Sequence, residues 1–319
     1  MAHDPQLLDC LIVGAGPAGL TAATYLARFH RCIAVVDAGT SRARWIPTSH
    51  NCPGFPLGVA GTQLLQKLRE QAEGYGAKIE SGRITHLDRD GEHFVASDDG
   101  GVQWRASCVL LATGIVDRMP PVAALDEAIA AGAIRLCAVC DGYEASDERI
   151  AVYGPVDEAI HHALFLRTFS RQVTVLRSEP GEPSDGCASL AGQARVAVLP
   201  VPRTLRFDPQ GGCTAGFDEG DERSFDTVYP VLGGDAQSQL ATALGAQVDD
   251  DGELIVDAHL QTTVDGLYAI GDVVSALNQI SVAVGHAALA ATAIHNRLPR
   301  NFREDETSQP ETAAALPSP

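Results

Sequence analysis

The chain has 319 residues, of which 45% are hydrophobic and 20% charged, and its formal net charge is −18. This length and composition are typical of a globular protein of about two domains. The acidic surface repels nucleic acid backbones and anionic lipids, so we exclude nucleic acids and membranes as main partners.

The sequence also predicts where the protein is found. Residues 1–9 lack the basic and apolar regions of a signal peptide, and no apolar run reaches the length of a membrane span. We therefore expect a cytoplasmic protein. Its eight cysteines are then expected to be mostly reduced thiols, and a disulfide among them is expected to be catalytic rather than structural.

The predicted elements form two copies of a strand–helix–strand unit. The first copy has a strand over 9–13, a helix over about 17–29 and a strand over 32–37. The second has a strand over 149–153, a helix over about 157–169 and a strand over 172–176. This is the βαβ pattern of a dinucleotide-binding fold. We therefore predict an α/β protein with two Rossmann-like, three-layer domains.

Further elements lie between and after the two copies. We predict an amphipathic helix over 61–75, short strands that end at 109–112, a buried strand over 266–272 and a long apolar helix over about 280–296. Residues 303–319 are polar and acidic and contain prolines. This composition predicts a disordered tail.

A glycine-rich turn, Gly14-Ala15-Gly16-Pro17-Ala18-Gly19, joins the first strand to the first helix. Gly14 permits the tight turn, Gly16 lets a pyrophosphate approach the helix N-terminus, and Gly19 lets helix and strand pack closely. Asp37 ends the next strand, at the spacing expected for a carboxylate that binds a ribose hydroxyl. The combination predicts a dinucleotide site. A glycine turn that serves only packing is the alternative.

Cys137 and Cys140 form a Cys-x-x-Cys pair that is followed by Asp141. Such a pair can close a small disulfide, and a thiolate at a helix start is stabilised by the helix dipole and nearby amides. Asp141 offers a proton donor and acceptor beside the pair. Half of a zinc site is one alternative, but the other six cysteines supply no second pair at zinc spacing, so we predict no metal. Two unrelated buried cysteines are the other alternative.

A third motif, Gly271-Asp272, follows the buried strand near the end of the chain. A carboxylate in this position can hold the ribityl chain of a flavin. An aspartate that merely caps a turn is the alternative.

Taken in order, these motifs resemble the low-molecular-weight thioredoxin reductase family. The resemblance rests on the turn at 14–19, Asn51-Cys52-Pro53-Gly54, Ala112-Thr113-Gly114, the cysteine motif at 137–142, and Gly271-Asp272 followed by Asn278-Gln279-Ile280. It implies FAD as the cofactor and a homodimer. It also implies a discontinuous FAD domain over 1–116 and 240–319, with an inserted domain over 117–239 that carries the two cysteines.

The resemblance also assigns roles to residues. Cys140 would face the flavin, Cys137 would exchange with the disulfide of a partner, and Asp141 would act as acid and base. The residues expected to hold FAD are Gly14, Ala15, Gly16, Pro17, Ala18, Asp37, Asn51, Thr113, Gly114, Gly271, Asp272, Gln279 and Ile280.

The second glycine turn departs from the family pattern. Members that use NADPH have a glycine where Val156 stands, and a β-branched side chain there blocks the approach of a pyrophosphate. Asp157 and Glu158 put negative charge at the helix N-terminus, where the anion would bind. The basic cluster that binds a 2′-phosphate in the family is reduced here to Arg177. The alternative is that Arg177 alone is enough to bind the 2′-phosphate. The chain thus resembles a divergent branch of the family without a functional NADPH site.

We therefore predict a thioredoxin reductase-like, FAD-dependent disulfide oxidoreductase. It would pass electrons between flavin and the Cys137–Cys140 disulfide, and on to a thioredoxin-like protein or a small dithiol or disulfide, without NADPH. A ferredoxin or a flavin is the candidate electron donor. The alternatives are an NADPH-dependent thioredoxin reductase, an FAD-dependent dithiol oxidase and a non-catalytic FAD-binding redox sensor. Related oxidases tend to have histidine in place of Asp141, and the intact cysteine pair argues against a sensor.

Overall fold

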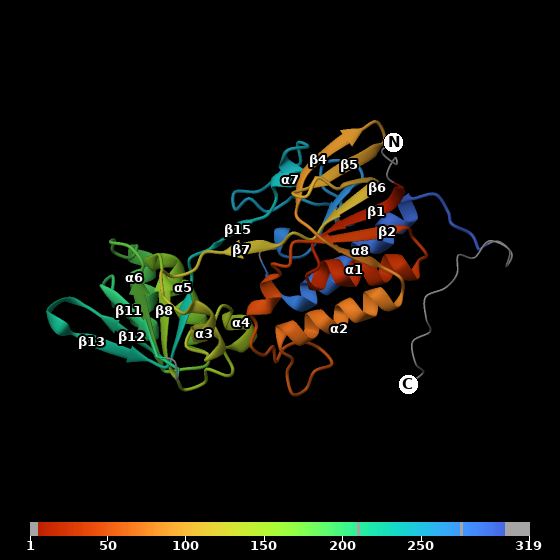
Figure 1. Ribbon diagram of the computed structural model, residues 1–319. Helices are drawn as coiled ribbons and strands as arrows, with labels where there is room; N and C mark the ends of the chain where they lie inside the picture. Colours follow the sequence, from red (N-terminus) through yellow and green to blue (C-terminus); the bar gives the residue numbers. More distant parts are fainter. Residues whose placement is uncertain (1–5, 209–210, 275–276, 304–319) are drawn as a thin grey trace. The chain divides into compact units, whose positions relative to one another are not determined.

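The computed structural model describes residues 6–208, 211–274 and 277–303 (Figure 1). Its contacts divide the chain into two compact units. The first unit comprises the described residues of 1–46, 61–116 and 235–319, and the second comprises those of 47–60 and 117–234. The domains predicted from the sequence were 1–116 with 240–319, and 117–239. The main difference is the segment 47–60, which the contacts group with the second unit.

The first unit is built on a seven-stranded sheet with the order β3-β2-β1-β6-β5-β4, in which β16 also pairs with β6. β1, β2, β3, β6 and β16 are parallel, whereas β5 joins β6 in antiparallel fashion and β4 joins β5 likewise. The strands are Leu7–Val13 (β1), Ile33–Asp37 (β2), Lys78–Ser81 (β3), Ile84–Asp90 (β4), His93–Asp98 (β5), Gln103–Leu111 (β6) and Leu267–Ala269 (β16). The carboxyl ends of β1 and β2 therefore lie at the same end of the sheet, where dinucleotide folds bind their ligands.

Both faces of this sheet are covered, as alternation along β1 shows. Cys10 and Ile12 belong to the core on the helical face, and Leu11 and Val13 to the core on the other face. The helical face carries α1 (Pro17–Arg28), α2 (Gly61–Gly74) and α8 (Ile280–Arg297), and the other core includes residues of β4, β5 and α7 (Gln239–Thr242). Such alternation is expected of a strand buried on both sides.

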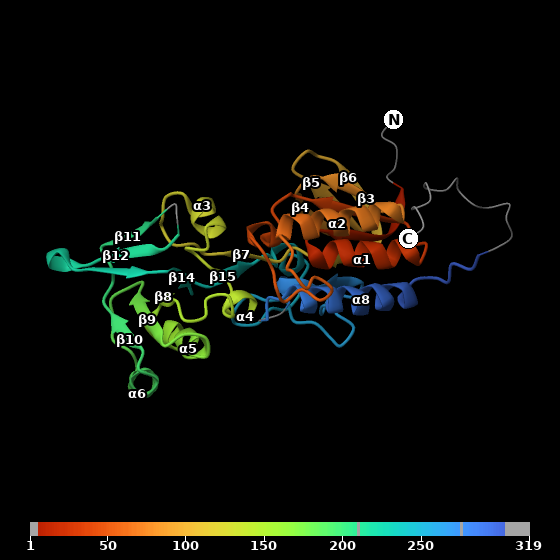
Figure 2. The same cartoon turned by 90° about the horizontal axis from the view of Figure 1, so that it is seen from below.

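Alanines explain how closely two of the helices pack. Figure 2 shows α1 and α8 side by side, and these helices contact each other. Both helices contribute fully buried alanines to one core, namely Ala22 and Ala23 from α1 and Ala287 and Ala290 from α8. Short side chains let the two helix backbones approach, so segments from the two ends of the chain share one core.

The second unit has its own four-stranded parallel sheet with the order β10-β9-β8-β14. One face is covered by α5 and α6, and a three-stranded antiparallel sheet, β11-β12-β13, shares the core of the other face. The strands are Arg149–Gly154 (β8), Gln172–Arg177 (β9), Ala197–Leu199 (β10), Thr204–Phe207 (β11), Cys213–Gly216 (β12), Glu222–Phe225 (β13) and Thr227–Pro230 (β14). The helices are Leu125–Ala130 (α3), Ala138–Asp141 (α4), Val156–Leu166 (α5) and Asp185–Ala194 (α6).

Two of the four boundaries between the units, at 116/117 and 234/235, fall within two short paired strands, Ile115–Asp117 (β7) and Gly234–Ala236 (β15). Three short 3-10 helices complete the described elements: Arg42–Trp45 (η1), Asp218–Gly220 (η2) and Gly271–Val273 (η3). Over the described ranges, no helix combines the length and the apolar character needed to cross a bilayer.

The elements predicted from the sequence are confirmed, with small changes at their ends. The helix expected over 157–169 ends at Leu166, because the next amides turn more tightly and Thr168 and Phe169 bond to carbonyls three residues back. The strand expected over 266–272 is only Leu267–Ala269, followed by η3. Both α/β units have the predicted βαβ pattern.

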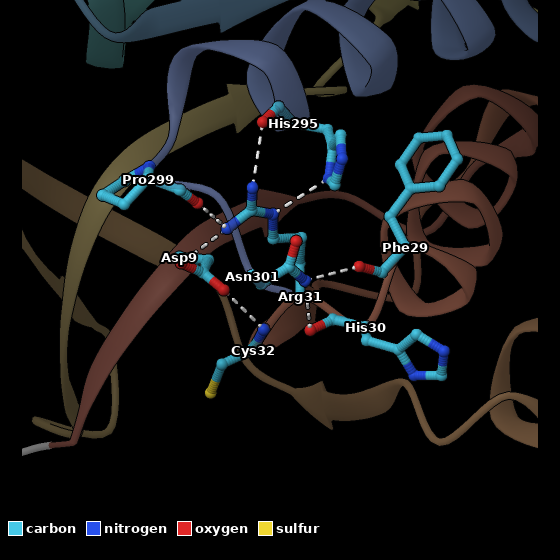
Figure 3. Close-up of polar contacts among 8 residues, drawn as sticks. All are labelled: Asp9, Phe29, His30, Arg31, Cys32, His295, Pro299 and Asn301. Carbon is cyan, nitrogen blue, oxygen red and sulfur yellow. Dashed lines mark hydrogen bonds and ion pairs between the residues drawn. The ribbon is translucent and has the colours of Figure 1, made fainter. Parts of the chain in front are cut away.

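The described chain beyond α8 is tied to the end of α1 (Figure 3). The buried Arg31 guanidinium donates to the carbonyl oxygens of His295 and Pro299, each at 2.9 Å, and Asn301 Nδ2 donates to the carbonyl of Phe29 at 2.8 Å. Asp9 adds an ion pair to Arg31 at 3.8 Å. The tail predicted to be disordered, 303–319, lies outside the described residues after position 303.

Candidate active site

The glycine turn after β1 has the close packing that the sequence predicted. Gly14 has a φ of +104°, and a Cβ there would collide with the carbonyl oxygen of Ala112. A Cβ on Gly19 would collide with the carbonyl oxygen of Gly14. Neither position has room for a side chain. Because both residues are glycines, the start of α1 can lie directly against the end of β1.

Gly16 is different, because the space in front of it is open. A Cβ on Gly16 would meet only the Ser41 hydroxyl, at 3.4 Å. Gly16 is the N-cap of α1, Pro17 opens the helix, and the first turn carries no acidic residue. Within the described residues, no side chain caps this helix start. An uncapped, uncharged helix N-terminus with open space before it fits the pyrophosphate of FAD.

Asp37 at the end of β2 is held at the same turn. Its Oδ1 accepts a hydrogen bond from the Ala15 N–H at 3.0 Å, and its Oδ2 lies 3.6 Å from Nη2 of Arg69. The carboxylate is partly exposed and fixed beside the open helix start. This arrangement fits a group that accepts hydrogen bonds from a ribose.

The C-terminal motif comes to the same place in the first unit. Gly271 has a φ of +73°, and a Cβ on it would lie 3.1 Å from Cβ of Ala18. The Gly271 N–H donates to Nδ1 of His286 at 3.3 Å, and burial lowers the pKa of His286, which keeps this nitrogen an acceptor. Asp272, next in the chain, lies 3.6 Å from Arg42. The two motifs, more than 250 residues apart in sequence, thus lie against each other in the first unit.

The remaining predicted FAD residues are spread over three places. The Thr113 hydroxyl donates to the carbonyl of Gln237 at 2.7 Å, and Gly114 follows with a φ of +67°. Gln279 is the N-cap of α8 and Ile280 its first residue. Asn51 is exposed and belongs to the segment that groups with the second unit, where its Nδ2 lies 3.4 Å from the carbonyl oxygen of Val139.

Cys137 and Cys140 form a disulfide, with their Cα atoms 5.3 Å apart. Cys137 is the N-cap of the single-turn helix α4, and its Sγ accepts the Cys140 N–H at 3.2 Å. The other six cysteines are free. In the part of the chain that the structure describes, no group of three or more His, Cys, Asp and Glu residues is placed to hold a metal ion.

Asp141, the last residue of α4, is held by two side chains that sequence reasoning missed. The Tyr229 hydroxyl donates to Oδ1 at 2.9 Å, and Nη1 of Arg135 lies 3.6 Å from Oδ2. Burial is the largest single effect on the Asp141 carboxyl, and together with Glu144 it raises the pKa above its ordinary value against the opposing effects of Arg135 and Tyr229. Tyr229 is 88 residues away in sequence, so no local signal could have revealed it.

The glycine turn of the second unit matches that of the first at one position only. A Cβ on Gly154 would collide with the carbonyl oxygen of Val231, the same kind of clash that excludes a side chain at Gly14. Where the first unit has Gly16, however, the second has Val156, and the first turn of α5 carries Asp157 and Glu158. Oδ1 of Asp157 accepts the Ser184 N–H at 3.0 Å.

Arg177, at the end of β9, already has several partners. Its Nη1 lies 2.8 Å from Oε1 of Glu182 and also donates to the carbonyl of Gly181, and its Nε donates to the carbonyl of Leu199 at 3.3 Å. Arg177 occupies in the second unit the position that Asp37 has in the first. A ligand that used this guanidinium would have to displace these contacts.

Comparison with known proteins gives consistent results. The family described as pyridine nucleotide-disulphide oxidoreductase matches residues 8–287. A thioredoxin reductase from Streptomyces coelicolor is 29% identical over 96% of this chain and 98% of its own length, and one from Streptomyces clavuligerus is 28% identical with the same coverage. The solved structure of thioredoxin reductase from Streptococcus pyogenes has a TM-score of 0.84 and 26% identity, and the match covers 92% of this chain and 98% of that one.

Proposed function

We propose that this chain, which belongs to the pyridine nucleotide-disulphide oxidoreductase family, is a thioredoxin reductase-like enzyme that works without NADPH. Membership makes it an FAD-dependent disulfide oxidoreductase. The proposal adds that electrons pass between FAD and the Cys137–Cys140 disulfide, and on to a thioredoxin-like protein or a small dithiol or disulfide.

One observation carries the proposal, namely the contrast between the two glycine turns. The first has an open position at Gly16 and no acid in the helix start, which suits an anion. The second has Val156 at the matching position and two carboxylates in the helix start. A β-branched side chain opposes close approach of a phosphate, and negative charge at a helix N-terminus opposes an anion. The first turn therefore supports FAD binding, and the second argues against NADPH.

In this proposal, the first unit binds FAD and the cysteine pair carries the electrons. The amides at the start of α1 would bind the pyrophosphate, Asp37 would bind the ribose, and Asp272 would bind the ribityl chain. When bound, FAD supplies or accepts two electrons. Two electrons added to the Cys137–Cys140 disulfide break its S–S bond, and two protons complete the two thiols.

The exchange with the partner is carried by this chain's own residues. As a thiolate, Cys137 attacks the partner's disulfide and forms a mixed disulfide, releasing one partner thiolate. Cys140 then attacks the sulfur of Cys137, which restores the internal disulfide and releases the second partner thiolate. The hydrogen bond from the Cys140 N–H to Sγ of Cys137 supports Cys137 as the more stable thiolate. Asp141 gives and takes the protons.

The electron donor and the assembly are further parts of the proposal. Without NADPH, a ferredoxin, a flavin or a dithiol would have to supply electrons. The relatives named thioredoxin reductase support thioredoxin as the exchanging partner. We also propose a homodimer and a cytoplasmic location, because the resemblance implies the first and the free cysteines suit the second.

An NADPH-dependent thioredoxin reductase is the second candidate. It is favoured by the family match, whose description names pyridine nucleotides, and by the coverage of curated thioredoxin reductases over 96% of this chain. In that case NADPH would bind the second unit despite Val156, and Arg177 would leave Glu182 to bind the 2′-phosphate.

The exchange reaction can be tested without knowing the donor. Oxidised holoenzyme is titrated anaerobically with reduced thioredoxin, and the visible absorption of the flavin is recorded. We expect the flavin to bleach through the cysteine pair, and the variant Cys137→Ser, titrated in the same way, to stay oxidised. Flavin that remains oxidised in the wild type, or that bleaches equally in Cys137→Ser, would contradict the proposed route.

A further inference from the structure

Both oxygens of the Asp141 carboxyl face side chains of the second unit. Oδ1 accepts a hydrogen bond from the Tyr229 hydroxyl at 2.9 Å, and the same hydroxyl lies 3.3 Å from the Asp141 carbonyl oxygen. Oδ2 faces Nη1 of Arg135 at 3.6 Å. About a fifth of the Asp141 side chain is exposed, so the carboxyl is held from the inside while one side stays accessible.

The two groups that hold Asp141 are fixed by the sheet of the second unit. Tyr229 is 2% exposed and lies on β14, where it pairs with Val152 of β8. The Arg135 N–H donates to the carbonyl of Val228, the residue before Tyr229, at 3.0 Å. Arg135 and Tyr229 are thus anchored at neighbouring positions of one strand edge. A carboxyl held by such rigid groups has a defined direction.

Several charged or hydrogen-bonding side chains around Asp141 change the pKa of its carboxyl. Arg135, before α4, and Tyr229, on β14, favour its ionised form, whereas Glu144, after α4, opposes ionisation. Burial has the largest effect and also opposes ionisation, so the pKa of Asp141 is raised. His50 of the segment 47–60 lies 4.0 Å from Glu144. Arg135 also lowers the pKa of Glu148, which burial raises.

We propose that Tyr229 and Arg135 are positioning residues, which hold the Asp141 carboxyl in the place and direction it needs for proton transfer at the Cys137–Cys140 pair. This inference rests on the proposed function, because it assumes that Asp141 moves protons for the cysteines. The hydrogen bond from Tyr229 fixes Oδ1, and the charge of Arg135 fixes Oδ2.

Substitutions around Asp141 should shift the pKa of its carboxyl in opposite directions, depending on the charge or hydrogen bond removed. Tyr229→Phe removes a hydrogen bond to the carboxylate, and Arg135→Gln removes a positive charge beside it, so each raises the pKa of Asp141 further. Glu144→Gln removes a negative charge and lowers this pKa. A purely structural disturbance would not move the two groups of variants in opposite directions.

The experiment follows the cysteine pair directly. The reduced holoenzyme is mixed anaerobically with the small disulfide dithiodipyridine over a range of pH, and the rate of exchange is measured. The rate rises with pH as the carboxyl loses its proton and can accept one from a cysteine thiol, and it rises again at higher pH as the thiols ionise without help; the first rise is the one followed here. We expect this rise at higher pH in Tyr229→Phe and Arg135→Gln and at lower pH in Glu144→Gln.

Two controls separate charge and position from general damage. Arg135→Lys keeps the positive charge and should leave the rise near its wild-type pH. Tyr153→Phe removes another largely buried hydroxyl, from β8 of the same sheet but in the core of its other face, and should leave the profile unchanged. The FAD content of each purified variant shows whether the variant is folded.

The variant Asp141→Asn tells the two proposals apart. If it abolishes the rise while Tyr229→Phe, Arg135→Gln and Glu144→Gln leave the rise in place, the positioning role is overturned and the role of Asp141 stands. If Asp141→Asn keeps the wild-type profile, the proton-transfer role in the proposed function fails, and the positioning role fails with it.

Discussion

Arg177 Nη1 lies 2.8 Å from the carboxylate of Glu182, five residues further along the chain. Arg177 is the one basic residue that sequence analysis found for a 2′-phosphate, and its guanidinium also donates to the carbonyls of Gly181 and Leu199. Glu182 is largely exposed, so the pair lies at the surface, where such pairs contribute about 0–1 kcal/mol. The pair is therefore a modest obstacle, and the larger obstacles to NADPH are Val156 and the carboxylates beside it.

A substitution that copies the second turn into the first should remove FAD. In Gly16→Val, a β-branched side chain fills the open space in front of α1. In the wild type, a Cβ at this position would have only the Ser41 hydroxyl nearby. We expect this variant to purify with most of its FAD lost. The flavin absorption per protein, measured after gel filtration, checks this. The matched variant Val156→Gly should retain its FAD, and an equal loss in both variants would argue against the first turn as the FAD site.

The reverse substitution should make the second turn a better binding site for NADPH. Val156→Gly combined with Glu158→Gln opens the turn and removes one negative charge from the start of α5. Two like charges at contact range in water repel by about 1 kcal/mol, so removing the Glu158 charge should tighten NADPH binding by up to about fivefold. Calorimetric titration of the double variant and of each single variant measures this gain. Unchanged affinity in the double variant would mean that another feature excludes NADPH.

The two cysteines should differ in their relation to the flavin. In Cys137→Ser, the remaining Cys140 thiolate is expected beside the flavin and should give a long-wavelength charge-transfer band. In Cys140→Ser, the remaining thiol is the one proposed to exchange with the partner, and it should give no such band. Absorption spectra of the two variants over a pH series check this. Identical spectra would show that the roles assigned to the two cysteines are wrong.

The contact between α8 and Arg31 should make stability depend on pH. Nε of Arg31 donates to Nδ1 of His295 at 3.1 Å, so this nitrogen must carry no proton, and burial together with Arg31 lowers the pKa of His295 below 6.5 (Figure 3). Unfolded His295 takes up a proton as the pH falls through 6.5, before folded His295 does. The stability that neutral His295 contributes is therefore fully present above pH 6.5. It is lost as the pH falls from 6.5 through the lowered pKa of the folded state.

This effect can be isolated with one variant. His295→Gln keeps a hydrogen-bond acceptor for Arg31 but does not titrate. We expect the difference in Tm between wild type and His295→Gln to grow in favour of the variant as the pH is lowered below 6.5. His286, whose pKa is also lowered by burial, remains in both proteins and cancels in the comparison. A difference that does not change with pH would contradict the assignment.

Local motifs made most of the fold and part of the candidate site predictable. The turn at 14–19 combines the end of a strand and the start of a helix within six residues, so its geometry follows from adjacent residues. The spacing of Cys137 and Cys140 likewise allows the disulfide that the structure contains. The strands and helices of both βαβ units follow from runs of apolar residues.

Features that depend on distant residues could not be predicted. The hydrogen bond from Tyr229 to Asp141 joins residues 88 apart, and the one from Ser184 to Asp157 joins residues 27 apart. Their meeting depends on how β14 and α6 pack in the second unit, which no local pattern encodes. The grouping of segment 47–60 with the second unit is of the same kind, because the segment lies between two parts of the first unit in sequence.

We expect that this flavoprotein does not take electrons from NADPH, and anaerobic stopped-flow mixing can show whether it does. Oxidised holoenzyme is mixed with excess NADPH, and in parallel with NADH, while the visible absorption of the flavin is recorded. Val156, Asp157 and Glu158 oppose the pyrophosphate in shape and charge, and Arg177 is engaged by Glu182. We therefore predict that the flavin stays oxidised on the time scale of turnover. Complete flavin reduction by NADPH within seconds would instead identify an ordinary NADPH-dependent thioredoxin reductase.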